Sequence, residues 1–254
     1  MEKRTELGMN RTGAQASPID VGKLAKFAQD QPATQSDETI ADLRAMALAE
    51  SDGVGSVPMP TTLTGAAQTV VGKLTGGQPT LLVDKLGERL AFERTGTRLY
   101  EAALMKFEQL DPAAPMLADL RRIRDQEAKH FALLSSALER IGADPTAQTP
   151  GADVAGVMSA GLMQAITDPR TNVGQCLDAL LVAELADNAS WELLVKLTRQ
   201  SGYDELAAQF EKAAREEAEH LAIVRQMLER TLLGEAAGGS AAAQTGQPLD
   251  PTLQ

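Results

Sequence analysis

The chain has 254 residues, a formal net charge of −11 and a single cysteine, Cys176. This length is enough to bury a substantial core in one or two domains. A surface with so much negative charge repels phosphate backbones, so we expect no nucleic-acid partner. One cysteine excludes disulfide frameworks, zinc ribbons and rubredoxin-type iron centres, because each of these needs at least two thiolates.

Composition and hydropathy favour a helical protein outside the membrane. Hydrophobic residues make up 43% of the chain but aromatic residues only 3%, which favours an all-α bundle over a β-sandwich or barrel. No apolar run approaches the roughly 18 residues of a membrane-spanning helix, and residues 1–10 lack the apolar segment of a signal peptide. We therefore expect a soluble, cytoplasmic protein with no membrane partner.

Residues 1–80 are interpreted as an irregular, extended N-terminal arm with short helices. The segment is rich in Gly, Pro, Ser, Thr and Gln, and Pro18 is interpreted as one of its breaks. One short helix is predicted from Asp37 to Glu50, where Ser36 is suited to cap the first turn. A second short helix is predicted near residues 63–74.

Strong helical periodicity fills residues 81–233, which we predict to form a four-helix bundle of two hairpins joined by a long crossover. The four long helices are predicted over residues 81–110, 112–141, 172–200 and 204–233. Gly142 and Gly202 are predicted to end the second and third helices. The crossover is predicted to contain a short helix from Asp153 to Ile166, and residues 234–254, rich in Ala, Gly and Gln, to form a disordered tail.

The apolar stripe of each long helix carries a glutamate at its middle. These glutamates are Glu93, Glu127, Glu184 and Glu217. The only two histidines of the chain, His130 and His220, each follow one of them by three residues. The segment Glu127-Ala-Lys-His130 matches Glu217-Ala-Glu-His220, and a Leu-Glu-Arg sequence follows both, which indicates a duplicated helical hairpin.

Geometry predicts that these six side chains converge. Residues at equal distances from the loop of an antiparallel hairpin lie at the same height, and the glutamates and histidines meet that condition in both hairpins. Four carboxylates in an apolar interior must bind protons or cations. Two divalent metal ions would balance their charge, and one imidazole for each ion would complete the ligand shells. Oxygen-rich ligation with one nitrogen per metal suits iron or manganese better than zinc.

This pattern resembles the ferritin-like di-metal carboxylate superfamily, most closely its bacterioferritin and rubrerythrin branch. The resemblance covers residues 81–233 and implies a ferritin-like four-helix bundle that holds two iron ions, or alternatively two manganese ions. It implies that Glu127 and Glu217 bridge the metals and that Glu93 and Glu184 are terminal ligands. His130 and His220 would then each cap one metal.

Several neighbours of the predicted ligands have two interpretations each. Tyr100, two turns after Glu93, is either a catalytic electron donor or a hydrogen-bond donor to a ligand, or else a core aromatic. Trp191, its counterpart in the second hairpin, is predicted to serve in packing. Gly96 either leaves room for a diatomic ligand or allows close helix packing.

The polar neighbours have similar alternatives. Thr97 and Asn188 either orient a carboxylate or bond between helices. Asp125 and Asp187 either hold a histidine N–H or, as we favour, are solvated or paired with an arginine; the candidate arginines are Arg94, Arg98 and Arg121. Glu216 is interpreted as a surface charge, with metal entry as the alternative.

The predicted function is reaction of a reduced di-iron site with O2 or peroxide, of the ferroxidase or peroxide-detoxifying type, which would limit free iron and oxidative stress. A dinuclear manganese catalase fits the same ligand set. A metal-binding structural or interaction protein without turnover is the third alternative. Because the arm and the tail differ from a compact ferritin subunit, we expect a homo-oligomer such as a dimer in place of a storage cage.

Overall fold

The computed structural model describes residues 17–30, 37–60, 79–111 and 114–244. All secondary structure in these ranges is α-helical, and no strand occurs in them. Among the described residues, no helix is both long and apolar enough to cross a membrane. The chain divides into two compact units, one of which contains residues 5–53 and the other the rest of the described chain.

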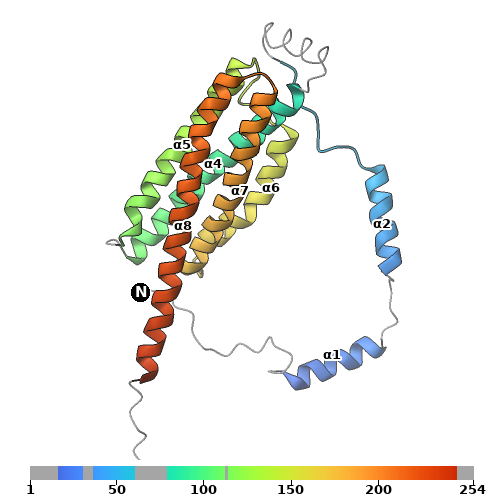
Figure 1. The fold of residues 1–254 in the computed structure, drawn as a ribbon. Coiled ribbons are helices and arrows are strands. Elements are labelled where there is room, and N and C mark those ends of the chain that lie inside the picture. The colour runs from blue at the N-terminus through green and yellow to red at the C-terminus, as the bar shows by residue number, and fades with distance from the viewer. Residues whose placement is uncertain (1–16, 31–36, 61–78, 112–113, 245–254) are drawn as a thin grey trace, which may run out of the picture. The chain divides into compact units, whose positions relative to one another are not determined.

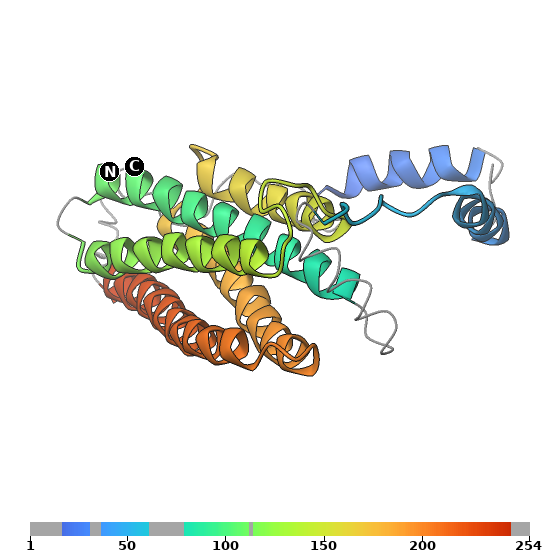
Figure 2. The same ribbon diagram turned by 90° about the horizontal axis from the view of Figure 1, so that it is seen from above.

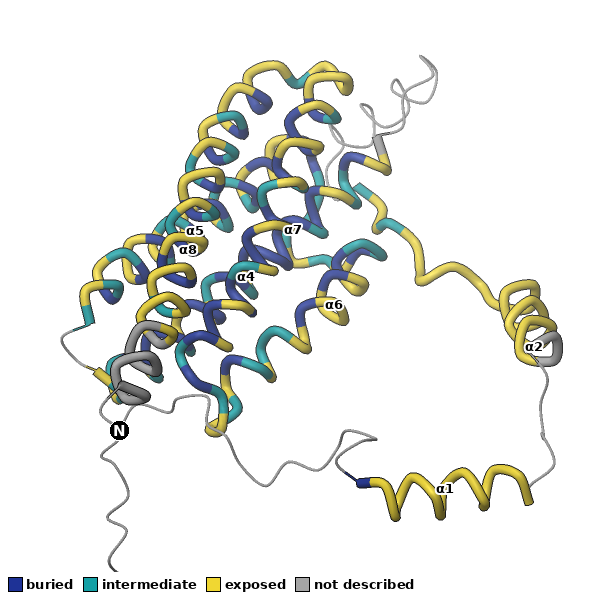
Figure 3. Tube along the Cα trace, turned by 60° about the horizontal axis from the view of Figure 1, so that its bottom comes forward, coloured by how far each residue is buried: buried dark blue, intermediate teal, exposed yellow. Residues whose placement is uncertain are grey.

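The first unit contains α1 (Pro18–Asp30) and α2 (Asp37–Glu50), and the described residues of both helices are exposed (Figure 3). The bounds of α2 are those predicted. Helix α1 was not predicted, because Pro18 was interpreted as a break in the chain. Pro18 is instead the first residue of the helix, where its fixed φ and missing N–H are tolerated. The predicted helix at residues 63–74 lies outside the described residues.

The second unit is a bundle of four long helices with a fifth helix on its outside (Figure 1). The four are α4 (Pro79–Leu110), α5 (Met116–Arg140), α7 (Val173–Gln200) and α8 (Asp204–Gln244). Each packs on two of the others, in the cyclic order α4, α5, α8, α7. The fifth helix, α6 (Pro150–Thr167), packs on α4 and α7 (Figure 2). This is the packing of a helical bundle.

The helix ends follow local sequence signals. Gly142 and Gly202, after α5 and α7, have φ angles of 81° and 82°, which glycine adopts without strain. Asn172 caps α7 in a reciprocal capping box with Gln175. Thr149 caps α6 by accepting a hydrogen bond from the Ala152 backbone N–H.

The largest differences between predicted and observed helix bounds are at the start of α5 and at the end of α8. Helix α5 begins at Met116, later than the predicted residue 112, because the residue before Pro115 is disfavoured from the helical conformation. Helix α8 continues to Gln244, past the predicted end at Leu233. The alanines after Gly234 have the highest helix propensity of any residue and favour continuation. The predicted division of the chain at residues 80 and 233 otherwise stays a prediction.

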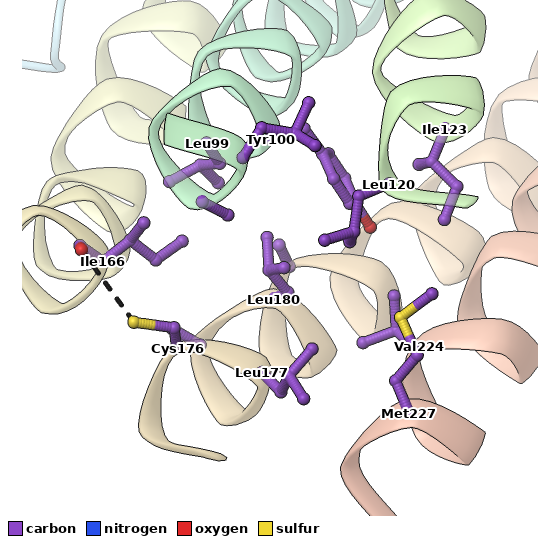
Figure 4. Close-up of a cluster of buried hydrophobic side chains, with 14 of the residues drawn as sticks. Leu99, Tyr100, Leu120, Ile123, Ile166, Cys176, Leu177, Leu180, Val224 and Met227 are labelled. Carbon is purple, nitrogen blue, oxygen red and sulfur yellow. Dashed lines mark hydrogen bonds between the residues drawn. The ribbon is translucent and has the colours of Figure 1, made fainter. Parts of the chain in front are cut away.

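Two apolar clusters fill the bundle, one towards each end. The first includes Leu104 and Phe107 of α4 together with Leu177 and Val224, and Figure 4 shows part of it, with the buried Cys176 at its edge. The second includes Leu82 and Leu86 of α4 with residues from α5, α7 and α8. Residues of α5 and of α7 enter the first cluster and then the second in the same order along the chain, so the two helices run parallel.

Candidate metal centre

The six side chains that the sequence singles out lie together between the two apolar clusters. Helix α4 contributes Glu93, α5 contributes Glu127 and His130, α7 contributes Glu184, and α8 contributes Glu217 and His220. None of the six is more than 2% exposed. The Glu-x-x-His spacing of α5 and α8 places each glutamate and its histidine one turn apart on one helix face.

These side chains form two overlapping groups of four. The first group is Glu93, Glu127, His130 and Glu217; the second is Glu127, Glu184, Glu217 and His220. In each group, one ligand atom per residue lies within 4.8 Å of the others. Glu127 and Glu217 belong to both groups. Two adjacent ions sharing two carboxylates would need this arrangement.

The Nδ1 atom of each histidine faces the carboxylates. His130 Nδ1 lies 2.5 Å from Glu217 Oε1 and 3.8 Å from Glu93 Oε2. His220 Nδ1 lies 3.1 Å from Glu217 Oε2 and 3.3 Å from Glu127 Oε1. The two imidazole centroids are 6.0 Å apart. Nδ1 is therefore the atom of each ring that is placed to bind an ion.

The Nε2 atoms point away from the carboxylate cluster to two further side chains. Glu216 Oε2 lies 2.9 Å from His130 Nε2, and Gln126 Oε1 lies 3.1 Å from His220 Nε2. Both oxygens are acceptors, so they favour a proton on Nε2 and leave the Nδ1 lone pair of a neutral ring free. The sequence analysis interpreted Glu216 as a surface charge and missed Gln126. The repeat contained the signal, because each of these residues directly precedes a glutamate of the cluster.

Tyr100 and Trp191 bond to glutamates across the two hairpins. The Tyr100 hydroxyl, on α4, donates a hydrogen bond to Glu184 Oε1. Trp191 Nε1, on α7, donates to Glu93 Oε1 at 2.7 Å. Trp191 also packs edge-on against His130, with centroids 5.5 Å apart. The packing role predicted for Trp191 is therefore only part of its contacts, since it also orients a carboxylate.

A buried ion pair beside Glu93 was not predicted. Arg89 and Asp187 are 3% and 2% exposed, and Arg89 Nη2 lies 3.0 Å from Asp187 Oδ1. Arg89 Nε is also 3.4 Å from Glu93 Oε1. Asp187 is therefore paired with an arginine, as favoured, but the arginine is Arg89 and not one of the three candidates, and the pair is buried, not solvated. Arg89 precedes Glu93 by one helical turn, which was the available signal.

The remaining candidates have other roles. Asp125 is exposed and pairs with Arg124 at 2.6 Å, consistent with the favoured surface interpretation. The Thr97 hydroxyl donates to the Glu93 backbone carbonyl at 3.0 Å, so its hydrogen bond stays within its own helix. A Cβ atom on Gly96 would lie 2.2 Å from Glu127 Oε2. The space at Gly96 is therefore filled by the Glu127 carboxylate.

Burial and mutual repulsion set the protonation of the cluster. Burial, with repulsion from neighbouring carboxylates, raises the pKa values of Glu93, Glu127 and Glu184 well above their usual range. Burial also opposes ionisation of Glu217, but its contacts with both histidines outweigh this effect and lower its pKa to about 2. Burial disfavours the charged form of His130, yet its contacts with Glu217 and Glu216 raise its pKa. Without cations, the cluster must therefore hold protons.

The cluster contains buried polar atoms that no hydrogen bond satisfies within the described part of the chain. They are Glu93 Oε2, both carboxylate oxygens of Glu127, and Glu184 Oε2. Such atoms normally cost about 1–3 kcal/mol each when they are buried without a partner. Three of them, Glu93 Oε2, Glu127 Oε1 and Glu184 Oε2, lie 3.3–4.0 Å from the Nδ1 atom of a histidine. The donor set is rich in carboxylate oxygen with one nitrogen for each position, which fits iron or manganese.

Comparisons of the chain with protein-family models, with curated proteins and with solved structures found no match. Membership of the ferritin-like superfamily is therefore a resemblance carried by the ligand spacing. Within its described residues, the structure provides an all-α bundle with a buried cluster of carboxylates and histidines, whose two overlapping groups could hold metal ions.

Proposed function

We propose that this chain is a ferritin-like, non-haem dinuclear metal protein that binds two iron ions and reacts with O2 or peroxide. The observation that supports it best is the pair of overlapping ligand groups, which share Glu127 and Glu217. The activity would be of the ferroxidase or peroxide-detoxifying type.

The charges of the interior support two divalent ions. Four glutamates carry four negative charges when ionised, and two divalent cations balance them. The fifth buried carboxylate near the cluster, Asp187, already has a cation 3.0 Å away in Arg89. Buried charge of this density is stable only when it is balanced.

Each residue of the centre would have a definite role. Glu127 and Glu217 would bridge the ions, while Glu93 and Glu184 would each bind one. His130 and His220 would each bind one ion through Nδ1. A pair of redox-active metal ions, when bound, supplies two electrons to O2 or peroxide.

The surrounding residues would keep this geometry fixed and dry. Trp191 and Tyr100 hold one oxygen each of Glu93 and Glu184. Burial, with the adjacent carboxylates, raises the pKa of Tyr100 well above its usual range, so its hydroxyl keeps its proton and remains a donor. This contact supports a positioning role for Tyr100. The apolar clusters on either side exclude water from the centre.

The test is anaerobic titration of the metal-free chain with Fe(II), followed by exposure to air. We expect two ions per chain and a ferric absorption band that grows after air is admitted. Glu127→Ala should lose binding at both positions, because Glu127 belongs to both groups. Glu139→Ala, an exposed glutamate of the same helix, is the matched control and should bind two ions.

Other outcomes would contradict parts of the proposal. Equal binding by Glu127→Ala and Glu139→Ala would refute the metal centre. Full occupancy with no absorption change in air would indicate a structural metal site without turnover. Vigorous gas evolution from peroxide by a manganese-loaded chain, with no response of the iron-loaded chain, would replace the iron chemistry with a manganese catalase.

A further inference from the structure

The internal repeat makes the two metal positions comparable. His130 and Glu93 of the first hairpin correspond to His220 and Glu184 of the second, and Glu127 and Glu217 are common to both positions. The indole of Trp191 and the phenol of Tyr100 also correspond, each donating one hydrogen bond to a glutamate. With equivalent surroundings, the two positions would bind ions equally.

The partners of the two histidines break this equivalence. Nε2 of His130 contacts a carboxylate oxygen of Glu216 at 2.9 Å, whereas Nε2 of His220 contacts an amide oxygen of Gln126 at 3.1 Å. A carboxylate partner raises the basicity of an imidazole ligand more than a neutral amide does. It also adds one negative charge beside the ion. The Glu216 side chain is 27% exposed, so water screens this charge only in part.

A second difference between the hairpins, among the buried groups beside the cluster, adds no net charge. Arg89 and Asp187 lie beside Glu93 as an ion pair, and the corresponding positions of the other hairpin are Leu180 and Gly96. The two charges of the pair offset each other. Lys212 lies 3.7 Å from Glu216 Oε1 but is 74% exposed, so its effect on the carboxylate is weak. Other charge differences between the hairpins, such as Lys129 and Glu219, lie at exposed positions where water screens them. Among the groups that contact the histidines, the charge of Glu216 is therefore the main electrostatic difference between the positions.

We propose that the two metal positions are unequal, and that the position of His130 binds a divalent ion more tightly and fills first because Glu216 supports its histidine. This inference depends on the proposed dinuclear centre. Outer partners of metal-binding histidines typically change affinity by about 10–100-fold. We therefore expect the first ion to bind at least about tenfold more tightly than the second.

The test uses Mn(II) alone as the probe, without oxygen chemistry. Calorimetric titration of the metal-free chain should give two separate binding steps. At one equivalent, the electron paramagnetic resonance spectrum should be that of an isolated ion, and anomalous diffraction should locate it beside His130. At two equivalents, coupling between neighbouring ions should broaden or remove that signal.

Two substitutions with opposite expected effects test the role of Glu216. Glu216→Gln gives both histidines an amide partner and should weaken the first step at least about tenfold, so that the two steps merge. Gln126→Glu gives both histidines a carboxylate and should strengthen the second step. Glu219→Gln removes the same charge from an exposed position of α8 and should leave both steps unchanged.

The outcomes separate this inference from the proposed function. If the wild-type chain binds two ions with one affinity, or fills the His220 position first, the inequality is refuted and the dinuclear centre stands. If the wild-type chain binds no Mn(II) or Fe(II), the proposed function fails. If Glu216→Gln does not fold, Gln126→Glu still decides the question, because strengthening of the second step supports the inference and no change overturns it.

Discussion

At the scale of single residues, the geometry of the candidate centre depends on Gly96 as well as on the six polar side chains. Gly96 faces Glu127, and the space that its missing side chain leaves is occupied by the Glu127 carboxylate. A glycine inside a helix costs about 1 kcal/mol relative to alanine. Here it allows a glutamate common to both metal positions to reach the centre.

Gly96→Ala should therefore abolish or strongly weaken metal binding. The new Cβ would lie 2.2 Å from Glu127 Oε2, so the shared carboxylate must move and both positions are affected. We expect affinity for Mn(II) to fall at least about tenfold, measured by calorimetry. Gly156→Ala is the control, since a Cβ there meets nothing within 4 Å. Unchanged affinity in Gly96→Ala would contradict the placement of Glu127.

The pair of Arg89 and Asp187 gives a second prediction at this scale. Arg89→Met leaves the Asp187 carboxylate buried without its cation, which should lower the free energy of unfolding by about 3–5 kcal/mol. The measurement is urea denaturation of the metal-free chain near pH 8, because burial raises the pKa of Asp187 to about 7. The double variant Arg89→Met, Asp187→Asn should recover most of the loss.

The control for this pair is Arg94→Met, which removes an exposed arginine from the same helix. Its effect should stay within about 0.5 kcal/mol. A loss in Arg89→Met no larger than in the control would show that the pair does not stabilise the fold.

At the scale of elements, α6 supports the bundle without contributing a ligand. Its N-terminus is fixed to α4, because Asp84 Oδ1 accepts a hydrogen bond from the Gly151 backbone N–H at 2.8 Å. Thr149 caps the helix and its hydroxyl donates to the Asp84 carbonyl at 3.3 Å. A Cβ on Gly87 of α4 would lie 2.6 Å from Thr149 Oγ1. The close approach of α4 and α6 thus depends on a glycine and a cap.

Thr149→Ala should destabilise the fold and leave the centre intact. Loss of an N-cap side chain costs about 1 kcal/mol, which a urea denaturation curve can measure. The stoichiometry of Mn(II) should remain two per chain, because no residue of either ligand group lies on α6. Thr167→Ala, an exposed position at the end of the same helix, is the control. Equal stability of the two variants would refute a capping role for Thr149.

The long helices and the convergence of the six side chains could be predicted from sequence because both depend on periodicity. Spacing along a helix places side chains on one face, and a hairpin brings equal distances from its loop to one height. For Arg89 and Gln126, spacing along the helix indicates a position beside the cluster but not the side chain that each one contacts. These contacts depend on side-chain direction across helices, which spacing along one helix does not determine. Pro18 was misinterpreted because proline both breaks helices and begins them.

At the scale of the whole molecule, the buried carboxylates lower the stability of the fold, and the two apolar clusters on either side of them raise it. The clusters stabilise the bundle, while the metal-free centre must keep carboxylates protonated against solvent pH. Binding of ions would remove this cost, since a ligand of the folded state alone raises the free energy of unfolding. The oligomeric state, partners and substrate stay predictions, because the interior of one chain does not determine its outer contacts.

Because protons and metal ions both neutralise the buried carboxylates, the stability of the fold should depend on pH in opposite directions with and without metal. Glu93, Glu127 and Glu184 have raised pKa values in the folded chain, so between about pH 5 and 8 the folded state binds more protons than the unfolded one. Stability must then fall as pH rises. The raised pKa of His130 acts in the same direction. Glu217, with a pKa of about 2, stays ionised between pH 5 and 8. It therefore affects the pH dependence of stability only below about pH 5.

Thermal and urea denaturation should therefore show that the metal-free chain is less stable at about pH 8 than at pH 5, by at least about 1.4 kcal/mol, the equivalent of one pKa unit. High salt should preserve most of this difference, because salt screens the surface charges but hardly reaches the buried ones. With saturating Mn(II) the trend should reverse, since ions and protons compete for the same oxygens and rising pH favours the ions. A metal-free chain whose stability rises over this range, or one whose pH profile Mn(II) leaves unchanged, would show that these carboxylates do not exchange protons for metal.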